Sequence, residues 1–280
     1  MKAGIIAVTK PGITAGVTLA GLAGMSLAAG GLPAPGRAAL CLLCLLAAAA
    51  GSAVLNVLLE RGTDALMTRT AWRGDAVGAT GVHEAAVFAT VLIASSSIAS
   101  YIFIGPTTCA LILAASVGYS LVYTLRLKRS PFGTVAGGIP GALPVLIGYS
   151  AIRPGLGFDG FILFTVMLLW QPPHFLALAM RHREEYERAG VPVMPAVLGE
   201  EFTRAFVFLY AAGLIPLTFS LSLFGYCSPN FGWFSLAAGT GFLVWYYIDL
   251  VRSRNYGRAF AASIGYIMMV LMAVVLDKAS

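Results

Sequence analysis

Nine apolar stretches, each long enough to cross a lipid bilayer, recur along this chain of 280 residues. About 20 apolar residues in a helix span the hydrocarbon core of a membrane, because each residue adds about 1.5 Å. The chain is 59% hydrophobic and only 11% charged, and a single soluble core could not bury that much apolar surface. We therefore predict an all-α, polytopic membrane protein. The predicted spans are residues 12–31, 38–58, 84–104, 107–126, 134–152, 158–180, 204–224, 231–250 and 258–277.

The charges predict the orientation of these spans. Of the 18 Lys and Arg residues, 15 fall on the side that holds the N-terminus, and the exceptions are Arg37, Arg153 and Lys278. Loops rich in Lys and Arg stay in the cytoplasm, so we expect a cytoplasmic N-terminus. The net charge of +6 then reflects topology and contact with anionic lipid headgroups, and no nucleic-acid-binding motif is visible. No Arg/Ser-rich transit segment precedes the first span, which favours a bacterial plasma (inner) membrane.

Two long polar connections, at about 59–83 and 181–203, fall on the same cytoplasmic side. They follow the second and sixth spans, and this spacing predicts two four-helix halves plus a ninth helix within a single domain, residues 1–280. Long polar loops on one face are where a membrane enzyme would keep its chemistry. Two small-residue spacings, Gly12-x-x-x-Gly16 and Gly137-x-x-x-Gly141, would allow close helix packing, although chance matches are expected among 32 glycines.

The end of the second span carries a stripe of polar side chains. Asn56, Glu60 and Asp64 are spaced i, i+4, i+8, so a helix would place them on one face over roughly 12 Å. Ionisable groups at membrane depth are expensive and usually functional. Hard oxygen ligands in this pattern suit Mg²⁺, which commonly holds phosphate-bearing substrates. A merely solvated helix end is the alternative, and the shared face together with the nearby Arg69 favours a phosphate and metal site.

A second motif is the basic segment from Tyr123 to Arg129, followed by the Gly- and Pro-rich residues 137–144. Positive charge at this position is compatible with simple anchoring at the cytoplasmic surface. The functional interpretation is that one or two of these cations, Lys128 and Arg129 among them, neutralise a diphosphate leaving group. Charge alone does not separate these two interpretations.

A third motif is Trp170-Gln-Pro-Pro-His174-Phe, followed by the charged residues 181–186. A histidine within a membrane span often serves only as a hydrogen-bonded packing residue. After a double proline, His174 could instead ligate iron, orient a phosphate or steer a proton, and the chemistry leaves these alternatives open. Glu184 and Glu185 could complete a second carboxylate site or be solvated.

At these motifs the chain resembles the protoheme IX farnesyltransferases (heme O synthases), a branch of the UbiA-type intramembrane prenyltransferases. The resemblance covers the whole chain, and the Trp-Gln-x-Pro-His-Phe segment is typical of the heme-farnesylating branch. The matching residues are Thr9-Lys10-Pro11-Gly12-Ile13, Asn56-x-x-x-Glu60-x-x-x-Asp64-x-x-Met67-x-Arg69-Thr70, Tyr123-Thr124-x-x-Leu127-Lys128-Arg129, Gly137-Gly138-x-x-Gly141-Ala142-x-Pro144, Trp170-Gln171-x-Pro173-His174-Phe175 and Tyr186-x-x-Ala189-Gly190-x-Pro192-x-x-Pro195.

The chain departs from the pattern of this family in its loops. Glu60 stands where the family usually has Asp, which keeps the charge but lengthens the side chain by one methylene. The segments 71–75 and 130–134 also differ from the usual sequences. These departures concern loop contacts and substrate preference more than the class of reaction.

The resemblance implies transfer of farnesyl from farnesyl diphosphate to a vinyl group of heme B. The heme vinyl would attack the allylic cation, and water would complete a hydroxyethylfarnesyl side chain. Mg²⁺ is the implied cofactor, and the implied partners are the bilayer and a heme A synthase or oxidase assembly machinery. The implied catalytic residues are Asn56, Glu60, Asp64, Lys128 and Arg129, the first three as metal ligands. The implied substrate-binding residues are Arg69, Tyr123, Gln171, Glu185 and His174, with His174 contacting the heme or its iron.

Two other functions fit parts of the pattern. Prenylation of an aromatic quinone precursor would use the same metal site, but the segment from Trp170 to Phe175 argues against it. The alternative outside the enzymes is a transporter or a heme-binding scaffold. Transporters more often place polar groups near the bilayer midplane, whereas the charges here collect at the cytoplasmic ends.

Overall fold

The computed structural model describes residues 3–280 as a bundle of helices, with no strand in this range. Nine helical segments in the described residues are long and apolar enough to span a membrane, which confirms the predicted multi-pass fold. The second span is longer than predicted, because its helix runs on to Asp64. The spans are α2 (Pro11–Ala29), α3 (Pro35–Asp64), α5 (Val82–Phe103), α6 to η2 (Pro106–Arg129), α7 with α8 (Gly133–Ile152), α9 (Phe158–Arg181), α12 (Glu200–Leu223), α13 with η3 (Pro229–Arg252) and α14 (Tyr256–Ala279).

Three of these spans are interrupted helices, and short helices connect others. The interruptions are modest changes of helix type or single-residue breaks, such as the one at Gly137. The parts of the interrupted spans are α6 (Pro106–Val117), the π-helix η1 (Gly118–Tyr123), the 3₁₀-helix η2 (Leu127–Arg129), α7 (Gly133–Ala136), α8 (Gly138–Ile152), α13 (Pro229–Tyr247) and the π-helix η3 (Ile248–Arg252). The short helices are α1 (Ala3–Val8), α4 (Trp72–Gly78), α10 (Arg183–Arg188) and α11 (Met194–Val197).

Proline sets the start of several spans. α2, α3, α6 and α13 each have a proline in their first turn, where the missing N–H would have no helical partner in any case. α2 ends at Gly30, which adopts the left-handed conformation (φ 66°) and donates its N–H to the carbonyl of Leu27. These signals explain why the spans begin and end close to the positions that the sequence predicts.

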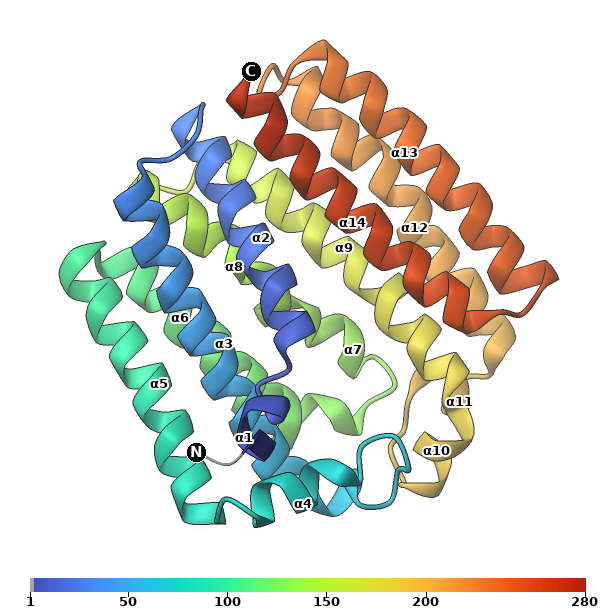
Figure 1. The fold of residues 1–280 in the computed structure, drawn as a ribbon. Helices are drawn as coiled ribbons and strands as arrows, with labels where there is room; N and C mark the ends of the chain where they lie inside the picture. The colour runs from blue at the N-terminus through green and yellow to red at the C-terminus, as the bar shows by residue number, and fades with distance from the viewer. Residues whose placement is uncertain (1–2) are drawn as a thin grey trace.

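The helices pack as the predicted two halves plus one (Figure 1). α2, α3, α5 and α6 are successive neighbours in the first half, and α8, α9, α12 and α13 are successive neighbours in the second. The last helix, α14, packs on α9 and α13 and also on α2, so it joins the end of the second half to the start of the first. A second junction, between α2 and α8, runs through the middle of the bundle.

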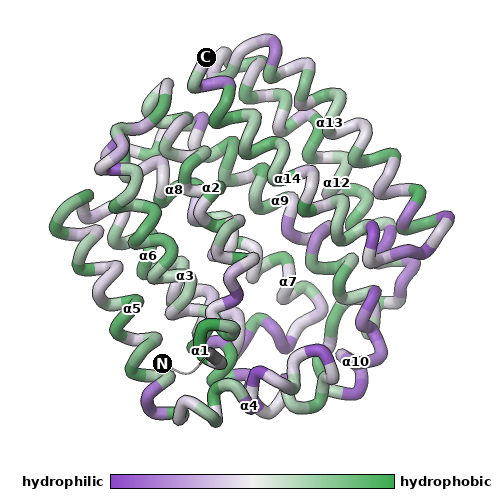
Figure 2. The backbone as a smooth tube through the Cα atoms, in the orientation of Figure 1, coloured by the Kyte–Doolittle hydropathy of each residue, from purple (hydrophilic) through white to green (hydrophobic). Residues whose placement is uncertain are grey.

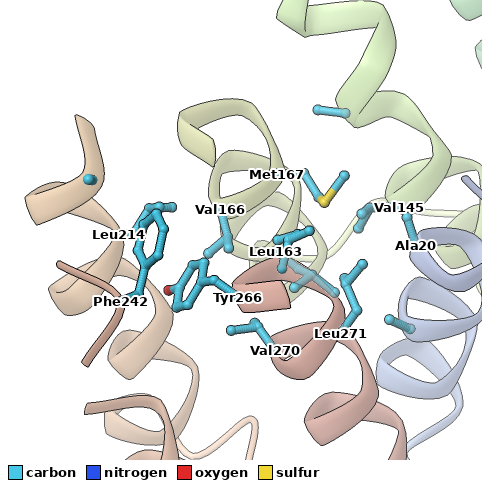
Figure 3. Packing of buried hydrophobic residues seen from close by; sticks show 14 of the residues in the cluster. Ala20, Val145, Leu163, Val166, Met167, Leu214, Phe242, Tyr266, Val270 and Leu271 are labelled. Atoms are coloured by element: carbon cyan, nitrogen blue, oxygen red, sulfur yellow. The ribbon is translucent and has the colours of Figure 1, made fainter. Parts of the chain in front are cut away.

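The largest apolar core lies in the second half and at its junction with α2. Tyr266 of α14 is fully buried there, stacks on Phe242 of α13 with ring centroids 4.6 Å apart, and shares a hydrogen bond with Thr218 of α12. Leu163 and Val270 pack beside it (Figure 3). The buried hydroxyls are therefore paired with each other, as the low dielectric of a membrane interior requires.

Polar residues gather at one end of the bundle. Figure 2 shows hydrophilic segments around α4 and α10, at the end opposite the C-terminus. This end holds the two long connections predicted to lie in the cytoplasm. Lys2, one of the basic residues assigned to the same side, lies outside the described residues.

The junction of α2 with α8 depends on glycine, but not on the spacings that the sequence suggested. A Cβ atom at Gly24 would lie 2.1 Å from the carbonyl oxygen of Val145, and one at Gly148 would lie 1.9 Å from that of Gly21. The two backbones are thus too close for any side chain between them. Of the predicted Gly12-x-x-x-Gly16 pair, Gly12 meets no atom of the described residues within 4 Å of such a position, whereas a Cβ at Gly16 would lie 3.2 Å from Met268 Cε on α14.

We expect Gly148→Ala to destabilise the protein, because the new methyl group would collide with backbone that cannot rotate away. Overpacking of this kind costs about 1–3 kcal/mol. The thermal unfolding midpoint in detergent measures the effect, with Gly241→Ala as control, since a Cβ at Gly241 meets nothing within 4 Å. Equal midpoints for both variants would contradict the close crossing.

Candidate active site

The polar stripe lies on the last three turns of α3 and is buried. Asn56, Glu60 and Asp64 are 2%, 9% and 2% exposed. The prediction that one helix carries all three is confirmed, because α3 ends only at Asp64. Their neighbour Leu59 is exposed, so the stripe is the inward face of a helix whose other face is apolar.

Each member of the stripe has a cationic partner from a different segment. Lys10 Nζ donates to Asn56 Oδ1 at 2.8 Å, and Lys128 Nζ lies 2.9 Å from Glu60 Oε1. Arg73 Nη1 lies 3.5 Å from Asp64 Oδ2. Buried carboxylates are tolerated only when they are paired, so these cations are needed for the stripe to be buried at all.

Asn56 is held in one orientation by its two neighbours. Its Oδ1 accepts from Lys10, and its Nδ2 donates to Thr124 Oγ1 at 3.0 Å. Lys10 also donates to the hydroxyl of Tyr119 at 3.3 Å. Lys10 itself adopts a left-handed conformation (φ 55°) at the N-cap of α2, which is uncommon for a non-glycine residue. Such strain is typical of functional positions.

The predicted basic segment is only partly drawn into this cluster. Lys128 on η2 contacts Glu60, whereas Arg129 is exposed and forms no ion pair within residues 3–280. Tyr123 is half-buried on η1 and stacks on Tyr119, with ring centroids 6.1 Å apart. Through Tyr119 it therefore adjoins the Lys10 and Asn56 pair.

The two long connections meet beside the stripe. The backbone N–H of Arg69 donates to Glu185 Oε2 at 3.4 Å, and Arg69 Nη2 donates to the hydroxyl of Tyr186 at 3.3 Å. Arg69 Nε is buried and has no hydrogen-bond partner in the described residues. This Nε–H is suited to donate to an anionic oxygen. Leaving a buried donor of a charged group without a hydrogen bond costs free energy, and an anion at this position would remove that cost.

The charge of Glu185 depends on these contacts. Burial raises the pKa of its carboxyl, but the N–H of Arg69 and the ring of His182, 3.3 Å away, together outweigh burial and lower the pKa below the ordinary value of 4.5. Glu185 is thereby held as a carboxylate that ties the first polar connection to the second.

Gln171 and His174 join helices. Gln171 Nε2 donates to the carbonyl of Gly138 at 2.8 Å, between α9 and α8. His174 Nδ1 shares a hydrogen bond of 2.9 Å with Ser263 of α14, and its ring lies between those of Trp170 and Phe260, at centroid distances of 4.5 and 4.4 Å. No hydrogen bond in the described residues connects either side chain to the stripe. Their roles in substrate binding remain predictions.

The donor set of the stripe fits Mg²⁺. No group of three or more His, Cys, Asp and Glu side chains that could hold a metal occurs in the part of the chain that the structure describes. Mg²⁺ does not need such a cage, since it is usually bound by one or two carboxylates, waters and the phosphates of a substrate. Glu60, Asp64 and the amide oxygen of Asn56 supply that smaller set.

Two residues of the cluster had no role assigned from the sequence. Lys10 belongs to the Thr-Lys-Pro-Gly-Ile segment at the start of the chain, and its position at the end of the first span that is predicted to be cytoplasmic is the available signal. Arg73 lies in the segment that departs from the family pattern, and nothing local indicates that it pairs with Asp64. Both contacts join residues on different helices.

Residues 17–273 match the model of the UbiA prenyltransferase family. The chain belongs to this family.

Among its relatives, a protoheme IX farnesyltransferase from Geotalea uraniireducens is 44% identical over 91% of this chain and 99% of its own length. Another from Albidiferax ferrireducens is 36% identical over 97% of this chain and 93% of its own length.

Solved structures share the fold at low identity. A UbiA homologue from Archaeoglobus fulgidus bound to DMAPP and Mg²⁺ has a TM-score of 0.74 at 17% identity, covering 98% of this chain and 99% of that one. A digeranylgeranylglyceryl phosphate synthase has a TM-score of 0.78 at 16%, covering 99% and 98%.

We expect Lys128→Met to destabilise the protein more than the double substitution Lys128→Met/Glu60→Gln. The single variant leaves the buried carboxylate of Glu60 unpaired, which should lower the free energy of unfolding by about 3 kcal/mol. The double variant removes the charge as well. The measurement is a double-mutant cycle, in which the thermal unfolding of wild type, both variants and Glu60→Gln is compared. If the two single substitutions change stability by amounts that add up to the effect of the double substitution, Lys128 and Glu60 do not interact.

We expect the stability difference between wild type and Glu185→Gln to depend on pH. Because the folded pKa of Glu185 is depressed, its contribution is present above the unfolded value of 4.5 and is lost as pH falls through the folded value. The unfolding midpoints of the two proteins should differ at pH 7 and converge below pH 4.5. A difference that stayed constant over this range would rule out the carboxylate as its source.

Proposed function

We propose that this chain transfers the farnesyl group of farnesyl diphosphate to a vinyl group of protoheme IX (heme B), giving heme O and diphosphate. The observation that carries the proposal is the buried stripe of Asn56, Glu60 and Asp64 with one cation beside each member. That arrangement suits a diphosphate with its metal. The acceptor is supported by relatives of nearly full length that are named protoheme IX farnesyltransferase.

The diphosphate would lie among the cations that now contact the stripe. Lys10 and Lys128 place ammonium groups at 2.8 and 2.9 Å from Asn56 and Glu60, and Arg69 offers a buried Nε that has no partner among residues 3–280. When bound, Mg²⁺ would be held by Asn56, Glu60 and Asp64 and would neutralise part of the diphosphate charge. Arg129, on the same turn as Lys128, is proposed as an additional cation.

The chemistry begins when the allylic C–O bond of the farnesyl diphosphate breaks and both electrons leave with the diphosphate. Lys10, Lys128 and Arg73 then stabilise the developing negative charge, which is the largest single term in many such reactions. The heme vinyl carbon forms the new C–C bond, and water adds to the resulting cation and loses a proton. Apolar surroundings favour this order, because bulk water would quench the allylic cation first.

The acceptor would contact the second half of the bundle. Gln171 and His174 lie on α9, and the aromatic rings of Trp170 and Phe260 flank the imidazole. Since Nδ1 of His174 bonds to Ser263, Nε2 is the ring nitrogen left for the heme or its iron within the described residues. Glu185, Tyr123 and the contact of Arg69 with Tyr186 would close the substrate site toward the aqueous side.

The orientation is also part of the proposal. The excess of Lys and Arg at the end of the bundle that holds the stripe supports an active site facing the cytoplasm of a bacterial inner membrane. The product, a more hydrophobic heme, would pass within the membrane to a heme A synthase or to oxidase assembly.

The direct test is an assay of purified protein with heme B, farnesyl diphosphate and Mg²⁺, followed by mass spectrometry of the extracted heme. We expect a heme heavier by one farnesyl and one hydroxyl group. Asp64→Asn should lower the rate by about 10²-fold or more, because it weakens the proposed Mg²⁺ site. Lys10→Met should also lower the rate, because it removes a cation beside the leaving group. Asp75→Asn, which changes an exposed carboxylate on α4, is the matched control and should leave the rate unchanged.

Other outcomes separate the alternatives. Unchanged heme with farnesyl transferred to a hydroxybenzoate or naphthoate acceptor would overturn the proposed acceptor and keep the diphosphate site. If the folded protein transfers farnesyl to no acceptor, the proposed enzymatic function is wrong. A transporter or a heme-binding scaffold is then the remaining alternative.

A further inference from the structure

A second charged site lies away from the stripe, where the end of α9 meets the start of α14. A cavity of about 660 Å³ is lined there by Arg181, Ser253, Arg254, Asn255, Tyr256, Gly257, Arg258 and Ala261. Three of these eight residues carry guanidinium groups, and none carries a carboxylate. The cavity is therefore a concentrated positive site at the boundary of two membrane spans.

The positive charge in this cavity is only partly compensated. Arg258 Nε lies 3.6 Å from Asp249 Oδ1, and its guanidinium lies over the ring of Trp245 at 5.3 Å. Arg181 and Arg254 form no ion pair and no side-chain hydrogen bond within residues 3–280. Glu200, at the start of α12, accepts a hydrogen bond from the hydroxyl of Tyr256 at 2.7 Å. All three arginine side chains are exposed, so their positive charge is available to an anion at the surface of the protein.

Two backbone features bring the guanidiniums together. A Cβ atom at Gly257 would lie 2.9 Å from Arg181 Nη1, so glycine at this position lets Arg181 reach across to the first turn of α14. Arg254 adopts a left-handed conformation (φ 49°), which is rare for a residue with a long side chain. Strain of this kind persists where the surroundings enforce it, and it is often found at ligand sites.

The neighbouring surface indicates what kind of anion fits. Trp245, which contacts Arg258, is 53% exposed, and Val244, Ile248 and Val251 on α13 and η3 are exposed beside it in the chain. In a membrane protein this apolar surface faces lipid, and a tryptophan at its edge is typical of the headgroup level. A basic cavity between the ends of two spans, next to lipid-facing apolar residues, matches the known pattern of lipid headgroup sites.

We propose that Arg181, Arg254 and Arg258 bind the phosphate of an anionic phospholipid, with its acyl chains lying along α13 and η3. The guanidinium fork suits phosphate oxygens, and the lack of a carboxylate in the lining favours a headgroup without a cation of its own. Free inorganic phosphate presents the same oxygens and is the alternative source of this chemistry. The site is independent of the stripe on α3.

The test measures lipid binding to the full-length, delipidated protein in detergent. Native mass spectrometry and the thermal unfolding midpoint are recorded with phosphatidylglycerol, phosphatidylcholine or inorganic phosphate. The variants are Arg181→Gln/Arg254→Gln, which removes two charges, and Gly257→Ala, which keeps every charge but displaces the Arg181 guanidinium. The controls are Gly265→Ala on the same helix, where a Cβ meets nothing within 4 Å, and Arg61→Gln/Arg188→Gln, which removes two exposed arginines elsewhere.

We expect wild type and both controls to bind one more phosphatidylglycerol than phosphatidylcholine and to gain a higher unfolding midpoint from it. The double variant should lose this preference, and Gly257→Ala should weaken it, because its Cβ displaces only the end of the flexible Arg181 side chain. An unchanged preference in the double variant would overturn the site, since both arginines are exposed and their replacement should leave the protein folded. Loss of the preference in Arg61→Gln/Arg188→Gln as well would show non-specific surface charge and would overturn the site. If inorganic phosphate raises the unfolding midpoint as much as phosphatidylglycerol does, the ligand is free phosphate and not a lipid.

Discussion

The burial of two carboxylates and an amide at the end of one membrane helix is the constraint on which the rest of the structure depends. Glu60 and Asp64 cannot be taken out of water unless cations accompany them, and α3 itself supplies none on that face. The partners come instead from the start of α2, from α4 and from η2. The packing of the first half therefore has to bring three separate segments to a single helix end.

The same cations that neutralise the resting site are the groups that a diphosphate would require. Lys10 and Lys128 contact the stripe at hydrogen-bond distance. Arg69 links the two polar connections, and its Nε has no partner in the part of the chain that the structure describes. A substrate anion with its metal would exchange one set of charge pairs for another. Neither carboxylate of the stripe would be left unpaired at either stage, which suits a site at the edge of a bilayer.

The sequence predicts the local features of this protein better than the long-range ones. Hydrophobic length predicts nine spans, and the i, i+4, i+8 spacing predicts that Asn56, Glu60 and Asp64 share a face, because both depend only on helix geometry. The roles of Lys10 and Arg73 were not predicted, since each pairs with a residue on another helix. The two glycine spacings do not identify the closest backbone contact, which lies at Gly24 and Gly148, because a spacing cannot reveal which helix it faces.

The position of the three cations in the chain has a consequence for biogenesis. Lys10, Arg73 and Lys128 all precede the fifth span, so every partner of the stripe emerges with the first four spans. Chains fold from the N-terminus during synthesis, and the charged end of α3 can therefore be neutralised before the second half has entered the membrane. The second half then adds the contacts of Glu185 and Tyr186 with Arg69 to a site whose two carboxylates are already paired.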